Sequence, residues 1–126
     1  MKKIAIAALV LLLGVGSGTA TQFSPAGNWE TTAGDSRFRV TLCGDGTELC
    51  AKLTWLRDDL RTEENLAYLN KYVVHRAKPS GPDSWQGTVD VYGEKASGNI
   101  KAVSDNKMRL TGCRAVLCQT LDFVRI

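Results

Sequence analysis

Two cysteine pairs, each flanking a short turn, constrain this sequence more than any other feature. Residues 36–43 and 50–56 alternate apolar and polar side chains around Gly44 to Leu49, a pattern typical of an antiparallel hairpin. If Cys43 faces Cys50, the pairs 42/51, 40/53 and 38/55 all fall on the apolar face. Because a one-residue slip would break both the pairing and the disulfide, the sequence predicts a hairpin with a Cys43–Cys50 bond.

The same test predicts a second hairpin near the C-terminus. Pairing Cys113 with Cys118 sets 112/119, 110/121 and 108/123 on the inner face. On the outer face this register places Arg109 opposite Asp122, and an opposite-charge pair across two strands favours it. We therefore expect a second local disulfide, Cys113–Cys118.

The other segments predict an all-β chain. Two more alternating segments meet at Gly93-Glu94, a turn suited to a two-residue hairpin, and residues 78–83 are predicted as a loop. Within residues 58–70, Thr62 is suited to cap a short helix that covers one barrel end. We expect an up-and-down antiparallel β-barrel of about eight strands, at residues 28–32, 36–43, 50–56, 72–76, 85–92, 95–103, 107–113 and 118–126.

The two ends of this barrel are expected to meet. Trp29 and Arg125 point inward by parity, on the first and last strands. An Arg laid across an indole contributes about 0.5 to 2 kcal/mol and would seal the barrel floor. With Gly27 two residues before Trp29, the arrangement resembles the Gly-X-Trp and Arg motif of lipocalins. This assigns Gly27, Trp29 and Arg125 to barrel closure.

The start of the chain predicts export. Residues 1–20 combine a basic start, an apolar run of about a dozen residues and a small-residue cleavage signal, which is typical of a signal peptide. Cleavage is expected after Ala20, with Ala26 as the alternative, leaving one β-barrel domain at residues 21–126 without a transmembrane segment. Two of the 16 basic residues lie in the signal, so the mature chain is near neutral and nucleic-acid binding is not expected. We expect a periplasmic protein, with secretion as the alternative.

A series of short motifs spans most of the chain after residue 26, namely Gly27-Asn28-Trp29, Cys43-Gly44, residues 49–56, Trp85-Gln86-Gly87, Tyr92, residues 110–113, Leu117-Cys118 and Arg125. Taken in order, these motifs resemble a bacterial exported family, the domain of unknown function 2147, whose members look lipocalin-like. The resemblance implies a small periplasmic barrel and carries no established activity. The chain departs from the family where the segment after Trp55 is shorter, at Ala96-Ser97, and at Phe123, where a Trp is common.

No catalytic or metal-binding constellation stands out. His75 is the one histidine, and a structural or surface role is the simpler interpretation. The acidic pairs Asp58-Asp59 and Glu63-Glu64 fit capping and solvated charge better than acid/base chemistry. The cysteine spacings fit hairpin disulfides better than zinc. We expect a non-enzymatic protein without a cofactor or metal.

One inner-face feature suggests binding. The predicted registers place Val89, Gly98, Gly112 and Gln119 in one row, where the glycines leave a notch and Gln119 adds an amide. The functional interpretation is a pocket for a small amphipathic ligand; the alternative is that the glycines admit a Trp and the barrel is solid. The expected pocket walls are Trp55, Trp85 and Phe123.

Three hypotheses of function follow. The first is a periplasmic barrel that binds a small apolar or amphipathic molecule. The alternative is an envelope protein-interaction module, such as an inhibitor of a hydrolase, that recognises a protein partner through its loops. The third is a hydrolase built around His75.

Overall fold

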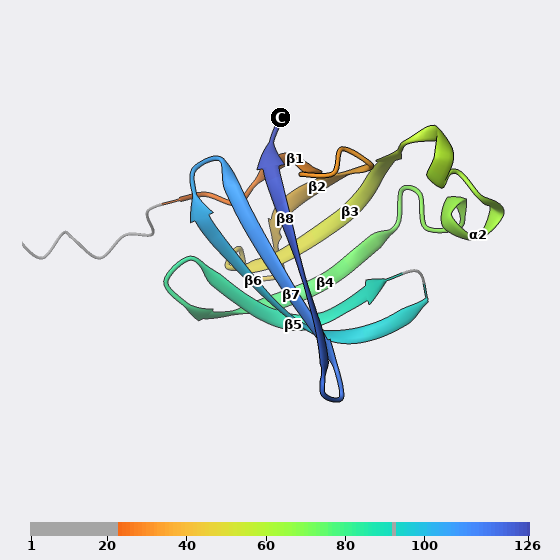
Figure 1. Ribbon diagram of the computed structural model, residues 1–126. Coiled ribbons are helices and arrows are strands. Elements are labelled where there is room, and N and C mark those ends of the chain that lie inside the picture. Colours follow the sequence, from red (N-terminus) through yellow and green to blue (C-terminus); the bar gives the residue numbers. More distant parts are fainter. Residues whose placement is uncertain (1–22, 92) are drawn as a thin grey trace, which may run out of the picture.

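The computed structural model describes residues 23–91 and 93–126, in which eight antiparallel strands close into a barrel (Figure 1). Each strand pairs with the next in sequence, and the last pairs with the first. The predicted fold class, a lipocalin-like up-and-down barrel, is confirmed. The elements are β1 (Gly27–Thr31), β2 (Ser36–Cys43), β3 (Glu48–Leu56), η3 (Asp58–Leu60), α2 (Glu63–Leu66), β4 (Tyr72–Gly81), β5 (Ser84–Val91), β6 (Glu94–Ser104), β7 (Lys107–Arg114) and β8 (Leu117–Arg125).

Two predictions fall outside the described residues: the signal peptide at 1–20, with its cleavage after Ala20, and the family position Tyr92. Between residues 23 and 126, apart from residue 92, no helix is long and apolar enough to cross a membrane.

Both local disulfides form as predicted, Cys43–Cys50 and Cys113–Cys118. The C-terminal register is confirmed as well, because Cys113 lies opposite Cys118 and Arg109 opposite Asp122. The Arg109 guanidinium donates to the Asp122 carboxylate at 2.8 Å on the outer face.

The register of the first hairpin was predicted wrongly by two residues. Cys43 lies opposite Glu48, and Cys50 lies opposite Thr41, so the disulfide bridges the strands diagonally. The turn is shorter than predicted because Gly44 and Gly46 adopt positive φ angles of 63° and 95°. A shift of two residues preserves the faces of the strands, so the apolar side still points inward.

Two smaller corrections concern β4 to β6. Residues 78–83 were predicted as a loop, but β4 continues to Gly81 and Pro79 pairs with Trp85. In the next hairpin Val91 pairs with Glu94, so the turn lies one residue earlier than the predicted Gly93-Glu94. Gly93 takes a φ of 88°, which lets the connection close tightly.

The predicted short helix is present between β3 and β4. The Thr62 hydroxyl accepts a hydrogen bond from the Asn65 amide at 3.1 Å, and Glu63 and Glu64 occupy the first turn of α2. Figure 1 shows α2 beside the barrel end at which the β1–β2 turn lies. We call this end the mouth and the opposite end, where the chain enters β1, the floor.

At the floor, Arg125 lies over Trp29, the contact that the sequence predicts. The guanidinium carbon is 4.4 Å from the indole centre, and Trp29 is only 1 % exposed. The Arg125 guanidinium also donates to the carbonyl oxygens of Ser24 and Ala26 at 2.8 Å and of Asp105 at 2.9 Å. A Cβ at Gly27 would lie 2.6 Å from Arg125 Nη1, so glycine is required there. One cation on β8 therefore ties the segment that enters β1 to the β6–β7 turn.

We predict that Arg125→Ala lowers the free energy of unfolding by about 2 kcal/mol, since the cation–π contact and charge-assisted hydrogen bonds are lost together. Arg125→Lys should recover only part of this loss, because an ammonium cannot reproduce the planar fork of donors. Urea unfolding followed by tryptophan fluorescence measures both. The control is Arg109→Ala on the exposed outer face. If Arg125→Ala and Arg109→Ala lower the free energy of unfolding equally, the sealing role of Arg125 is contradicted.

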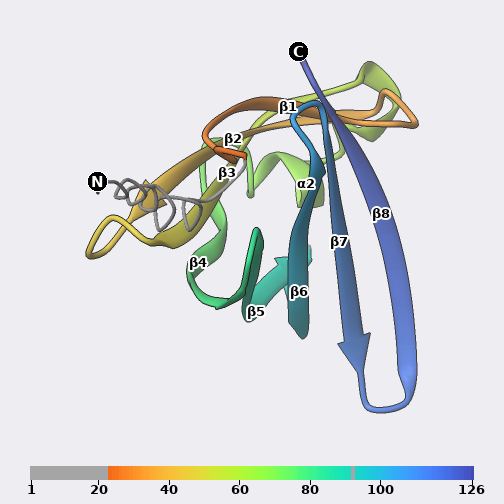
Figure 2. The same ribbon diagram turned by 90° about the vertical axis from the view of Figure 1, so that its left-hand side faces the viewer.

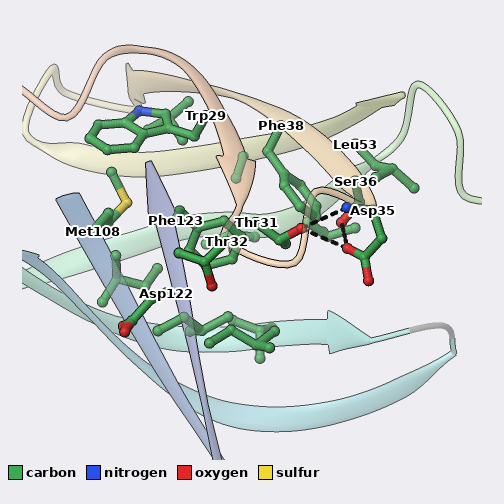
Figure 3. A pocket seen from close by; sticks show the side chains of 18 of the residues that line it. Trp29, Thr31, Thr32, Asp35, Ser36, Phe38, Leu53, Met108, Asp122 and Phe123 are labelled. Carbon is green, nitrogen blue, oxygen red and sulfur yellow. Dashed lines mark hydrogen bonds between the residues drawn. The ribbon is translucent and has the colours of Figure 1, made fainter. Parts of the chain in front are cut away.

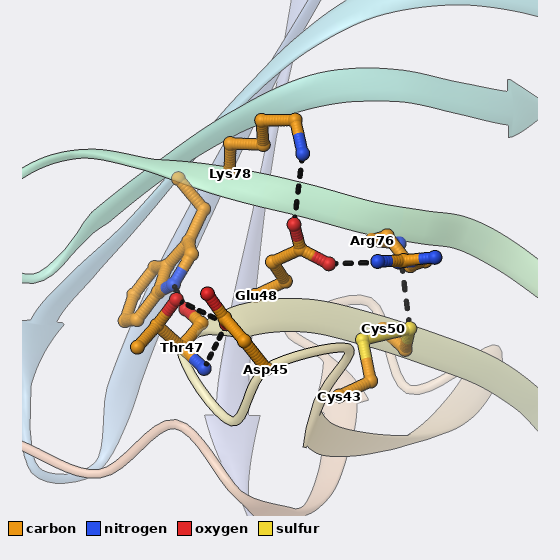
Figure 4. Close-up of a disulfide and its surroundings, with 8 residues drawn as sticks. Cys43, Asp45, Thr47, Glu48, Cys50, Arg76 and Lys78 are labelled. Carbon is orange, nitrogen blue, oxygen red and sulfur yellow. Dashed lines mark hydrogen bonds and ion pairs between the residues drawn. A yellow bond between two sulfur atoms is a disulfide. The ribbon is translucent and has the colours of Figure 1, made fainter.

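A second ionic contact joins β3 to β4 beside the first disulfide (Figure 4). Glu48 is 6 % exposed and accepts from Arg76 Nε at 2.7 Å and Lys78 Nζ at 2.8 Å. Hydrogen bonds from Lys78 and Arg76 hold the pKa of Glu48 below its ordinary value of 4.5. A Cβ at Gly44 would collide with the Glu48 carboxylate, so the turn glycine makes room for this contact.

The Glu48 contact predicts an acid-dependent loss of stability. A carboxyl with a lowered folded pKa stabilises the fold above its unfolded pKa, and this contribution disappears as the pH falls through the folded pKa. The stability difference between the natural chain and Glu48→Gln should therefore be constant near neutrality and shrink below about pH 4.5. Urea unfolding across a pH series checks this, with Glu64→Gln in α2 as the exposed control. A difference independent of pH would contradict it.

Candidate ligand-binding cavity

The barrel is hollow between its floor and its mouth. A cavity of about 360 Å³ opens at the mouth, and most of its wall is apolar (Figure 3). Trp29 and Met108 form its inner end, and Phe38 meets Phe123 edge-to-face with ring centroids 5.5 Å apart. The other apolar wall residues come from seven strands and include Val40, Leu49, Ala51, Leu53, Val73, Val74, Val89, Ile100, Leu110 and Leu121.

The mouth carries a hydrogen-bonded polar cluster from the β1–β2 turn. The hydroxyls of Thr31 and Ser36 donate to Asp35 Oδ1 at 2.6 and 3.1 Å, and the Asp35 amide donates back to Thr31 Oγ1 at 3.1 Å (Figure 3). Thr31 and Ser36 are buried, while Asp35 is half-buried. The cluster places a carboxylate at the edge of an apolar space.

Two further carboxylates border the mouth. A hydrogen bond from Lys95 lowers the pKa of Asp90, and one from Arg109 lowers the pKa of Asp122. Both groups are therefore ionised at neutral pH. Each is paired with an exposed cation, Asp90 with Lys95 at 3.1 Å and Asp122 with Arg109 at 2.8 Å, so these two groups add little net charge to the mouth.

The segment between β3 and β4 covers part of the mouth, as the sequence predicts. Leu60 from η3 and Asn65 from α2 line the cavity, and Asn65 Nδ2 donates to the Leu60 carbonyl at 2.9 Å. Leu66 is exposed, so the cover is partial and the cavity remains open to solvent.

Of the seven residues predicted to form the pocket, Val89 and Phe123 line the cavity. Trp55 does not, because a bulge between Arg37 and Phe38 turns it to the outer face, where Arg37 stacks 4.3 Å from its ring. Trp85 is buried near the floor, and its indole donates to the Thr47 carbonyl at 2.9 Å. Both tryptophans are structural.

The predicted glycine notch is not the cavity. Gly98 pairs with Gly87 rather than with Val89, and a Cβ on Gly98 would lie 2.6 Å from Val89 Cγ1. The Val89 side chain therefore fills this space. Gly112 meets only ordinary contacts, and Gln119 is exposed rather than inside, because β8 runs past the end of its partner β1.

The sequence predicted only some of the residues that line the cavity. Alternation placed Phe38, Val40 and Leu53 on the inner face, but the choice of pocket residues favoured tryptophans and glycines. The Thr31, Asp35 and Ser36 cluster was missed, since a polar turn carries no signal that distinguishes it from any other turn.

The acid/base candidates do not form a site. His75 is exposed on β4, with its ring 6.1 Å from that of Tyr72. Asp59 pairs with Arg57 at 2.6 Å, and Glu63 and Glu64 are exposed in the first turn of α2. In the part of the chain that the structure describes, no three His, Cys, Asp or Glu side chains group as metal ligands.

The chain matches no protein family model, no curated protein and no solved structure at a significant level. The resemblance to the domain of unknown function 2147 therefore stays a prediction from the motifs.

The cavity predicts an unusual tolerance to added volume at one buried alanine. Ala51 lines the cavity, whereas Ala102 is packed in the core outside it. Ala51→Phe should change the free energy of unfolding by less than about 1 kcal/mol, while Ala102→Phe should cost about 1 to 3 kcal/mol or more through overpacking. Urea unfolding of the two variants measures this, and equal losses would mean that no space exists beside Ala51.

Proposed function

We propose that this protein is an exported, periplasmic and non-enzymatic barrel that binds a small apolar or amphipathic molecule in its interior. The observation that carries the proposal is the cavity of about 360 Å³, with apolar walls and a polar mouth. Its volume falls within the roughly 300 to 1,000 Å³ range of small-molecule pockets.

The apolar part of such a ligand has a defined place. Phe38, Leu53 and Phe123 surround the space with apolar atoms, and burying a ligand there removes its surface from water at about 25 cal/mol per Å². The floor is closed by Trp29. A ligand therefore enters from the mouth with its apolar end first.

The polar end of the ligand would remain at the mouth. Asp35 accepts two hydroxyl hydrogen bonds through Oδ1, which fix the orientation of its carboxylate. Asp90 and Asp122 also border the mouth, but each is already paired with a cation, Lys95 or Arg109, so Asp35 sets the charge preference. This rim favours a neutral or cationic head group and opposes an anionic one.

Export is supported by two independent features. The chain begins with a basic, apolar and small-residue segment typical of a signal peptide. Both disulfides bridge neighbouring strands, and such bonds persist in oxidising compartments such as the periplasm.

The proposal predicts a head-group preference in binding. Titrated into the delipidated protein, dodecylamine should bind more tightly than dodecanoate, which has the same chain with a negative head. Native mass spectrometry and tryptophan fluorescence follow both titrations. Asp35→Asn should reduce the difference in affinity between dodecylamine and dodecanoate, because the variant removes one carboxylate from the rim.

The matched control tests the interior. Ala51→Phe should abolish binding of both probes, while Ala67→Phe on the exposed end of α2 should leave both unchanged. Failure of both probes to bind the natural chain, together with no ligand retained on purification, would overturn the proposal.

A further inference from the structure

The β7–β8 hairpin extends past the rest of the barrel. Of the nine residues of β8, only Phe123 to Arg125 pair with β1. Figures 1 and 2 both show the hairpin tip projecting beyond the neighbouring strands. Among the described residues, no strand lies on the outer side of Leu117 to Leu121, and all five of these residues are exposed.

The hydrogen-bond pattern shows which backbone groups face this open edge. On the β7 side, the Arg125 amide donates to the Asn106 carbonyl; on the β1 side, the Asp122 carbonyl accepts from the Thr32 amide at 3.0 Å. Because these directions alternate along a strand, the N–H and C=O groups of Cys118 and Thr120 point away from β7. Four backbone groups are thus presented to a further strand.

The side chains along this edge are self-complementary. Leu117, Gln119 and Leu121 share the concave face, so the pattern Leu-x-Gln-x-Leu reads the same in both directions about Gln119. In an antiparallel pair centred there, Leu117 faces the partner's Leu121 and Gln119 faces the partner's Gln119. Cys118 and the partner's Thr120 then exchange both of their free hydrogen bonds.

Charge supports the same pairing. No charged residue lies between Ala115 and Leu121, so no like charges meet across the two strands. A register centred on Thr120 is worse, because it faces Leu121 with an amide and needs the Asp122 carbonyl that Thr32 already occupies.

We propose that two copies of this chain form a two-fold symmetric dimer by pairing β8 with β8 about Gln119. The pairing covers Val116 and Leu117, which are 92 % and 76 % exposed in one copy. It involves only a few residues on each side, below the size of a standard stable interface, so the dimer is weak and depends on concentration. The turn at Val116 of each copy then lies beside Thr32, at the cavity mouth of the other.

The first test is a covalent trap. Residues facing each other in a non-hydrogen-bonded pair have Cα atoms about 4.5 Å apart, which suits a disulfide. Gln119→Cys should give a disulfide-linked dimer in which the two introduced thiols are joined and Cys113–Cys118 is intact by peptide mapping. The control is Gln86→Cys, exposed in the middle of the sheet on β5. Absence of the crosslink, or equal crosslinking of the control, would overturn the proposal.

The second test needs no new disulfide. In sedimentation up to millimolar protein, the natural chain should shift from monomer to dimer. Gln119→Lys should remain a monomer with an unchanged circular dichroism spectrum, because two ammonium groups then face each other across the two-fold axis, whereas Gln86→Lys should behave like the natural chain. A natural chain that stays monomeric, or a dimer unaffected by Gln119→Lys, would overturn the proposal. Each result is independent of ligand binding in the cavity.

Discussion

The short pairing between β1 and β8 determines where this barrel is closed and where it is open. It consists of three facing residue pairs, and Arg125 seals it by lying over Trp29 and binding the carbonyl groups of the entering chain. Strand β1 has five residues and β8 has nine, so the sheet can close fully at one end only. A closed floor, an open mouth and a free strand edge all follow from this mismatch in length.

The location of the cavity follows from the same asymmetry. At the floor, large side chains such as Trp29, Trp85 and Met108 fill the narrow end of the barrel. Toward the mouth, the wall formed by β8 departs from β1, and no aromatic side chain fills the space beyond Phe38 and Phe123 in the described part of the chain. Glycine allows close packing in a different part of the wall: a Cβ on Gly87 would lie 3.0 Å from Ala77 Cα, so Gly87 lets β4 and β5 approach closely, and the hollow lies elsewhere.

Alternation and cysteine placement predicted the fold because both depend on local physics. The two-residue period fixed which side chains face inward, and register errors of two residues in the hairpins around Gly44 and Gly93 left the faces unchanged. The site was predicted less well because it depends on departures from the regular pattern. The bulge after Arg37 rotated Trp55 outward, and the unequal strand lengths left Gln119 in solvent. Neither the bulge nor the difference in strand length can be recognised from the residue types.

The barrel holds an apolar space above its sealed floor, and xenon tests for this space most directly because the gas occupies apolar cavities. A crystal of the delipidated protein under xenon pressure should show xenon between Val40, Leu53 and Phe123, with Trp29 still covered by Arg125. Absence of xenon, with side chains filling that space, would contradict the account.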